Sequence, residues 1–123
     1  MTLYYKDFDN KTVVITGGAS GLGKGTAKVF AEHGANIVLV DIDSTKLDLV
    51  GNEIKQMGVK VSFYTCDVTN YNQIKNIINK QNRIDILVNN AGDNIPEHFT
   101  SSEDGTRLNS SHSYISYAVF CFK

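Results

Sequence analysis

The sequence is poor in several features that mark specialised classes of protein. Its 123 residues include one proline, two cysteines and no tryptophan, and 12 basic side chains nearly balance 13 acidic ones. A net charge of −1 gives no overall field to attract a phosphate backbone, so binding of nucleic acid through bulk charge is disfavoured. The hydrophobic fraction of 41% and charged fraction of 20% indicate one globular domain and argue against a disordered or collagen-like chain.

Cysteine and long apolar runs are also scarce. Cys66 and Cys121 are too few for a disulfide framework, their spacing matches no zinc or redox motif, and no histidine stands at ligand spacing from them. Residues 1–7 lack the basic start and apolar core of a signal peptide, and no apolar run approaches the roughly 18 residues that a membrane-spanning helix needs. We therefore expect a cytoplasmic chain in a reducing setting, with no metal site and no membrane contact.

What is present is a regular alternation of two patterns over residues 10–92, within a domain of βαβ units that we expect to span residues 1–92. Short apolar runs rich in β-branched residues alternate with segments of helical periodicity. This alternation predicts an α/β fold, a doubly wound, Rossmann-like parallel sheet of four strands with three helices. The predicted strands are 12–16, 36–40, 59–64 and 84–88, and the predicted helices are 22–33, 44–58 and 70–79.

Residues 93–123 lose this rhythm and include six of the nine serines. We expect them to form an atypical tail that is partly disordered or a single helix. No fifth strand is convincing after Pro96, so the strand predicted at 84–88 would be an uncovered edge, open to a second copy or a partner subunit. The uncharged stretch 114–122 would aggregate if unpaired, and a buried helix or strand is the alternative interpretation.

A glycine-rich turn follows the first predicted strand and precedes the first predicted helix. Gly17 would allow a tight turn, while Gly21 and Gly23 would let a pyrophosphate approach the helix N-terminus. Free N–H groups and the helix dipole favour anions at such a position. The alternative is a helix-entry turn that binds no ligand.

An acidic residue, Asp41, ends the second predicted strand, 18 positions after Gly23. A carboxylate there can accept hydrogen bonds from both hydroxyls of an adenosine ribose, and its charge repels a 2′-phosphate. Ser20, directly before Gly21, brings no positive charge to such a phosphate, although Lys24 is near. The pattern favours NAD over NADP, the alternative being an exposed carboxylate without a ligand.

These motifs together resemble those of the short-chain dehydrogenase/reductase family. Residues 16–23, Thr-Gly-Gly-Ala-Ser-Gly-Leu-Gly, resemble its Thr-Gly-x-x-x-Gly-x-Gly turn, and residues 89–92 match its Asn-Asn-Ala-Gly signature. Residues 66–69, Cys-Asp-Val-Thr, resemble its Asp-Val segment after the third strand. The resemblance covers residues 8–92, the N-terminal, cofactor-binding half of the family pattern. It implies an NAD(P)-dependent oxidoreductase that acts on alcohol or carbonyl groups.

The resemblance also implies a role for each matching residue at an NAD site. The glycine turn would face the phosphates, Asp41 and Ile42 the adenosine ribose, and Asp67 and Val68 the adenine. Residues 89–92 would pass close to the ribose nearer the nicotinamide. Without the resemblance, Asp67 is read as a helix-entry carboxylate and Asn89 as a turn former. The implied cofactor-binding residues are Gly17, Ser20, Gly21, Leu22, Gly23, Asp41, Ile42, Asp67, Val68, Asn89, Ala91 and Gly92.

The family's catalytic segment has no counterpart in this sequence. Family members transfer hydride with a Ser and a Tyr-x-x-x-Lys segment beyond Asn-Asn-Ala-Gly, in which the lysine lowers the pKa of the acid/base tyrosine. Tyr114 and Tyr117 have no lysine four positions later, and Tyr71, which does precede Lys75, opens a helix on the predicted adenine side. We interpret Tyr71 and Lys75 as a surface pair and name no catalytic residue.

Three interpretations stay open for such a chain. The first is a truncated piece of an NAD-dependent oxidoreductase, which we expect to lack turnover. The second is a non-catalytic module that binds NAD and pairs with another subunit. The third is an inactive truncated product.

Overall fold

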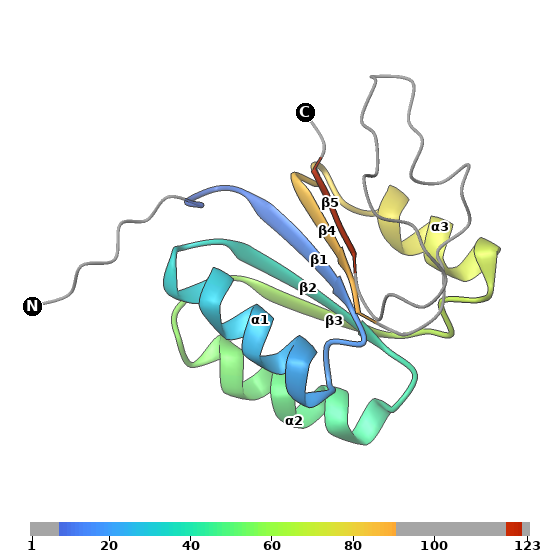
Figure 1. Ribbon diagram of the computed structural model, residues 1–123, viewed down its shortest axis with the longest axis horizontal. Helices are drawn as coiled ribbons and strands as arrows, with labels where there is room; N and C mark the ends of the chain where they lie inside the picture. Colours follow the sequence, from blue (N-terminus) through green and yellow to red (C-terminus); the bar gives the residue numbers. More distant parts are fainter. Residues whose placement is uncertain (1–7, 91–117, 122–123) are drawn as a thin grey trace, which may run out of the picture.

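The computed structural model describes residues 8–90 and 118–121, which form one sheet flanked by helices (Figure 1). The sheet has the strand order β3-β2-β1-β4-β5, and its first four strands are parallel. This confirms the predicted doubly wound α/β fold. The elements are β1 (Thr12–Thr16), α1 (Gly21–Glu32), β2 (Asn36–Asp41), α2 (Ser44–Lys55), β3 (Val61–Thr65), α3 (Tyr71–Asn79), β4 (Ile86–Asn89) and β5 (Ala118–Cys121).

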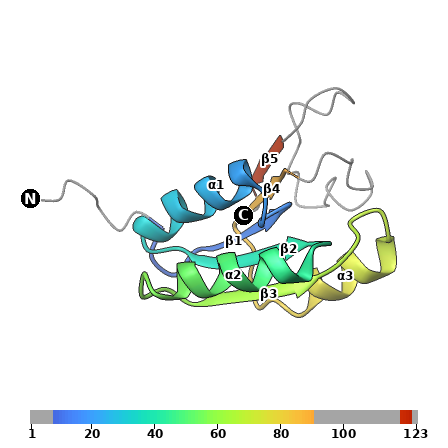
Figure 2. The ribbon, with the colours of Figure 1, turned by 90° about the horizontal axis from the view of Figure 1, so that it is seen from below.

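The sheet is packed on both faces, which explains why its strands are continuous apolar runs. β1 lies at the centre and all five of its residues are buried. α1 and α2 lie next to each other on one face, and α3 lies on the other (Figures 1 and 2). Alternate residues of the parallel strands β1 to β4 therefore face two separate cores. The α1 and α2 side includes Val13, Ile15, Ile37 and Leu39, and the α3 side includes Val14, Val38, Val40 and Leu87.

Each helix starts at a short polar side chain that accepts a hydrogen bond from its first turn. Ser20, Asp43 and Asn70 are the N-caps of α1, α2 and α3. These caps follow the carboxyl ends of β1, β2 and β3 along the chain, so the segments that begin the helices lie at the sheet edge where ligands of such folds bind. Within the described residues, no helix has the length and apolarity needed to cross a membrane.

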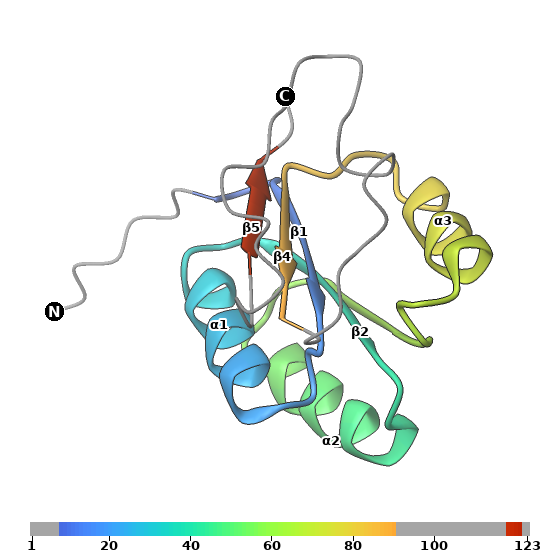
Figure 3. The ribbon, with the colours of Figure 1, turned by 45° about the vertical axis from the view of Figure 1, so that its right-hand side comes forward.

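A fifth strand corrects one prediction from the sequence. β5 pairs antiparallel with β4, with Cys121 opposite Ile86 and Ala118 opposite Asn89 (Figure 3). The predictions that no strand follows Pro96 and that the fourth strand is an uncovered edge are therefore wrong. The physical reason is that β5 is stabilised by a partner distant in the sequence, which local patterning does not reveal. The other tail residues, 93–117 and 122–123, lie outside the described residues.

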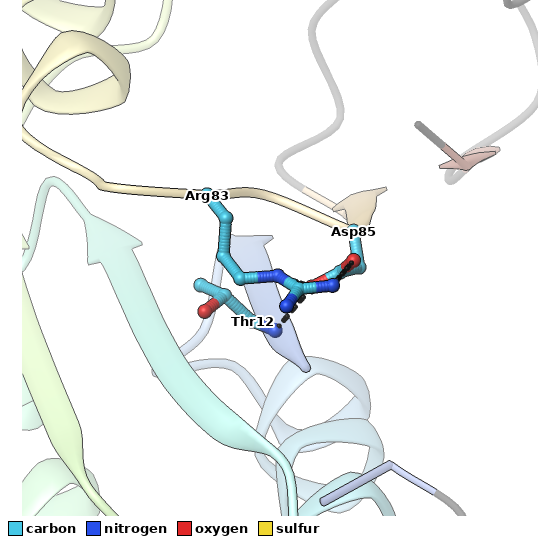
Figure 4. A network of polar contacts seen from close by, with 3 residues as sticks. All are labelled: Thr12, Arg83 and Asp85. Atoms are coloured by element: carbon cyan, nitrogen blue, oxygen red, sulfur yellow. Dashed lines mark hydrogen bonds and ion pairs between the residues drawn. The ribbon is translucent and has the colours of Figure 1, made fainter. Parts of the chain in front are cut away.

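A charged network ties the start of β4 to the start of β1 (Figure 4). The Thr12 N–H donates to Asp85 Oδ2 at 2.8 Å, and Arg83 donates through Nε to Oδ2 at 2.9 Å and through Nη2 to Oδ1 at 2.6 Å. Burial acts to raise the pKa of Asp85, but the bonds from Arg83 and Thr12 outweigh it and hold that pKa below its usual value. The network fixes the amino ends of both strands, opposite the edge described next.

Candidate functional site

A pocket of about 280 Å³ lies at the carboxyl ends of the parallel strands. The chain runs from β1 outward through β2 to β3 and then returns to place β4 on the other side of β1, so the strand order reverses beside β1. Ligands of open α/β sheets bind at such a reversal. The pocket is lined by Gly17, Ser20, Asp41, Ile42, Cys66, Asp67, Val68 and Asn90.

The glycine turn between β1 and α1 is held by one carbonyl. Gly17 has a φ of 66°, which favours glycine, and its carbonyl accepts from the Ser20 N–H at 3.1 Å and the Ser20 hydroxyl at 2.8 Å. The Asn90 side-chain amide donates to the same oxygen at 3.3 Å and to Ser20 Oγ at 2.9 Å. A Cβ on Gly23 would stand 2.1 Å from this oxygen, so only glycine fits there.

Asp41 is bonded through both carboxylate oxygens to backbone. Its Oδ2 accepts from the Ala19 N–H and its Oδ1 from the Asp43 N–H, each at 2.9 Å. The Asp41 carbonyl also accepts from the Cys66 N–H at 2.9 Å. One residue thus ties together the glycine turn, the entrance of α2 and the end of β3.

Asp67 forms a tight turn at the entrance of α3. Its Oδ1 accepts from the Thr69 N–H at 2.9 Å and from the Thr69 hydroxyl at 2.6 Å, and these bonds lower the pKa of Asp67. The neighbouring Cys66 is almost fully buried, and burial, together with the charge of Asp67, raises the pKa of its thiol. The pocket therefore presents an ionised carboxylate beside a neutral thiol.

The two asparagines after β4 have different surroundings. Asn89 is buried and its Oδ1 accepts from the Thr16 hydroxyl at 2.8 Å. The Thr16 oxygen in turn accepts from the Asn90 N–H at 3.0 Å, while the Asn90 side chain reaches the glycine turn and lines the pocket. Sequence reasoning selected Asn89 as a site residue and did not select Asn90.

The structure brings together half of the residues that the sequence selected. Gly17, Ser20, Asp41, Ile42, Asp67 and Val68 line the pocket, joined by Cys66 and Asn90, which the sequence did not single out. Cys66 had a signal, since it directly precedes Asp67 in a motif already noted. Gly21, Leu22, Gly23 and Asn89 stand in the adjoining segments without lining the pocket, and Ala91 and Gly92 lie outside the described residues.

Tyr71 and Lys75, the tyrosine and lysine four residues apart, contact each other on α3. Lys75 Nζ stands 5.6 Å from the centre of the Tyr71 ring, the geometry of a cation–π pair. Neither side chain lines the pocket. Across residues 8–90 and 118–121 there is also no cluster of three side chains suited to hold a metal ion.

Residues 11–114 match the family model of the short chain dehydrogenases. The chain belongs to that family. Short-chain dehydrogenase reductase 3b of Arabidopsis thaliana is 40% identical over 104 residues, a match that covers 80% of this chain and 38% of the relative.

Solved structures of short-chain dehydrogenases share the fold. A citronellol catabolism dehydrogenase of Pseudomonas aeruginosa PAO1 superposes with a TM-score of 0.67 at 34% identity, covering 84% of this chain and 44% of that one. An NAD+-bound xylitol dehydrogenase superposes with a TM-score of 0.61 at 28% identity, covering 66% of this chain and 33% of that one. This chain thus spans less than half the length of the relatives that it matches.

Proposed function

We propose that this chain binds NAD in the pocket at the carboxyl ends of β1, β2 and β3. The observation that carries the proposal is the convergence of a fixed glycine turn with two carboxylates, Asp41 and Asp67, around one cavity. A dinucleotide offers a pyrophosphate to the turn, ribose hydroxyls to one carboxylate and a base to the other. The bound NAD would supply the hydride acceptor of a redox reaction, and the chain's own residues would hold its adenosine half.

The phosphate end of this site is the first turn of α1. A helix leaves its first N–H groups without intrahelical partners, and Ser20 accepts that of Gly23 at 3.1 Å. The N–H groups of Gly21 and Leu22 are the donors that we assign to the pyrophosphate. A Cβ on Gly21 would meet nothing within 4 Å, which supports open space beside that donor.

The charges around the ribose end favour NAD over NADP. Asp41 and the α2 cap, Asp43, place two carboxylates where a 2′-phosphate would enter. Lys24, which directly follows the glycine turn, has its Nζ 3.0 Å from Glu53 Oε1 and is engaged between α1 and α2. A 2′-phosphate would therefore meet like charge with no cation in the lining to offset it.

We further propose that the reaction served by this site is oxidation of an alcohol or reduction of a carbonyl. The support is family membership, since both superposed structures are named as dehydrogenases and one is described as NAD+-bound. We assign no acid/base residue within the described part of the chain, because its one Tyr-x-x-x-Lys pair, Tyr71 and Lys75, stands away from the pocket. The adenosine half of the site is the part that these residues support.

Calorimetric titration of the 123-residue chain with NAD and with NADP tests the proposal. NAD should bind more tightly than NADP, and Asp41→Ala should weaken NAD binding at least about tenfold, the loss expected for a charged hydrogen-bond acceptor. Asp48→Ala is the matched control, because Asp48 is an exposed carboxylate on α2 that does not line the pocket. A cooperatively folded sample that binds neither dinucleotide would refute the proposal.

A further inference from the structure

The turn between β3 and α3 holds the Asp67 carboxylate on one side only. Thr69 donates twice to Oδ1, from its N–H at 2.9 Å and from its hydroxyl at 2.6 Å. Among the described residues, both hydrogen bonds to this carboxylate reach Oδ1. Asp67 lines the pocket, and its Oδ2 receives no hydrogen bond from the described residues, so it is the oxygen left to accept one from a ligand.

The Thr69 hydroxyl is not needed to form the turn itself. The backbone closes the turn through the Asn70 N–H, which donates to the Asp67 carbonyl at 2.9 Å. Asn70 then caps α3 by accepting from the Gln73 N–H at 3.2 Å. Thr69 is exposed, so its side chain adds no packing that would explain the short bond. What its hydroxyl adds is a fixed direction for the Asp67 carboxylate.

We propose that Thr69 is a positioning residue that directs the Oδ2 atom of Asp67 toward the exocyclic amino group of adenine. This proposal rests on the proposed binding of NAD. An ionised carboxylate only accepts hydrogen bonds, so the base edge facing it must donate one. Adenine places an amino group there, whereas hypoxanthine places a carbonyl oxygen that the carboxylate repels.

The experiment measures, by calorimetry, the affinity for NAD relative to nicotinamide hypoxanthine dinucleotide. The wild-type chain should prefer NAD by about tenfold, the effect of one hydrogen bond to a charged acceptor. Thr69→Val removes the hydroxyl at nearly constant shape and should reduce this preference severalfold, while Thr69→Ser restores the bond and the preference. Thr26→Val is the control, because the Thr26 hydroxyl bonds to the Leu22 carbonyl on α1 and does not line the pocket.

A second variant tests the orientation directly and does not depend on the stability of Thr69→Val. In Asp67→Asn, the amide oxygen should take both bonds from Thr69, which leaves the amide NH₂ group facing the base. The preference should then reverse toward the hypoxanthine dinucleotide, and adding Thr69→Val should abolish the reversal because the amide is free to flip.

The outcomes separate the two proposals. If the folded wild-type chain binds neither dinucleotide, NAD binding itself is refuted. If it binds NAD but Thr69→Val keeps the full preference, or Asp67→Asn does not reverse it, then the positioning role of Thr69 is refuted while NAD binding stands.

Discussion

Replacing Gly23 and Gly25 by alanine, one at a time, tests whether the glycine turn requires glycine at position 23. The second variant measures the effect of the same change elsewhere in the helix. Both residues belong to α1, and a glycine inside a helix costs about 0.5–1 kcal/mol relative to alanine. A Cβ on Gly25 would meet nothing within 4 Å. A Cβ on Gly23 would stand 2.1 Å from the Gly17 carbonyl oxygen and 2.9 Å from Asn90 Nδ2.

The magnitude follows from what the new methyl group must displace. A comfortable contact between heavy atoms is about 3.5 Å, so the Gly17 oxygen would have to retreat by roughly 1 Å or more. That oxygen accepts three hydrogen bonds from Ser20 and Asn90, and all three would be distorted. Overpacking of this kind costs about 1–3 kcal/mol. Because the helical gain is common to both variants, their difference in unfolding free energy should be about 1–3 kcal/mol.

Urea unfolding of both variants and of the wild type measures this difference in unfolding free energy. Titration of the same samples with NAD measures their affinity for the cofactor. Gly25→Ala should be as stable as the wild type or up to about 1 kcal/mol more stable, with unchanged NAD affinity. Gly23→Ala should be the least stable of the three and should bind NAD at least about tenfold more weakly, because the displaced turn misaligns the donors of the first helical turn. Equal stabilities and affinities for Gly23→Ala and Gly25→Ala would refute the reasoning.

Two further predictions concern charges away from the pocket. Asp85→Asn should lower the unfolding free energy by about 1–2 kcal/mol at pH 7, since it weakens the bonds from Arg83 and the Thr12 N–H. The folded pKa of Asp85 is depressed, so the stability that it contributes is present above its ordinary pKa of about 3.9 and is lost as the pH falls through the folded value. The gap between the urea midpoints of the variant and the wild type should therefore shrink as the pH is lowered below about 3.9, and a gap that does not shrink would contradict this account. Glu53→Gln breaks an exposed pairing with two lysines of α1. It should lower the melting temperature slightly at low salt and not at all in 0.5 M NaCl, because the distance over which exposed charges interact falls from about 10 Å in 0.1 M salt to about 3 Å in 1 M salt.

The elements that could be predicted from the sequence are those whose signal is local. The β-branched run of β1, the glycine turn and the periodicity of α1 adjoin one another in the chain, and each depends on its neighbours within a few residues. β5 has no such signal, because what stabilises it is a backbone ladder with β4 formed across the intervening chain. An apolar run such as Ala118–Cys121 suits a buried helix or a strand equally well until its partner is known.

The different surroundings of Asn89 and Asn90 follow from where β4 ends. The predicted strand ends at residue 88, whereas β4 ends at Asn89. Side chains of a strand alternate between faces, so a strand that is one residue longer carries Asn89 into the sheet, where it bonds to Thr16. The next side chain, Asn90, is then the one that reaches the glycine turn.

The carboxylates show a different limit, because three of the four hydrogen bonds to Asp41 and Asp67 come from backbone N–H groups, which the residue types do not reveal. Two roles for Asp67 were open from the sequence, a carboxylate at a helix entry or a residue that binds adenine. The hydrogen bonds from Thr69 show the first role and are compatible with the second. Asp41 is similar, since both its oxygens already hold backbone N–H groups at 2.9 Å. An oxygen atom has a second lone pair, so a carboxylate held by one bond at each oxygen still accepts another from a ribose hydroxyl. At Asp41 the structural bonds and the proposed ligand bonds therefore use different lone pairs of the same atoms, whereas at Asp67 they use different oxygens. In both residues the bonds that form the sheet edge also orient the acceptors before any ligand arrives.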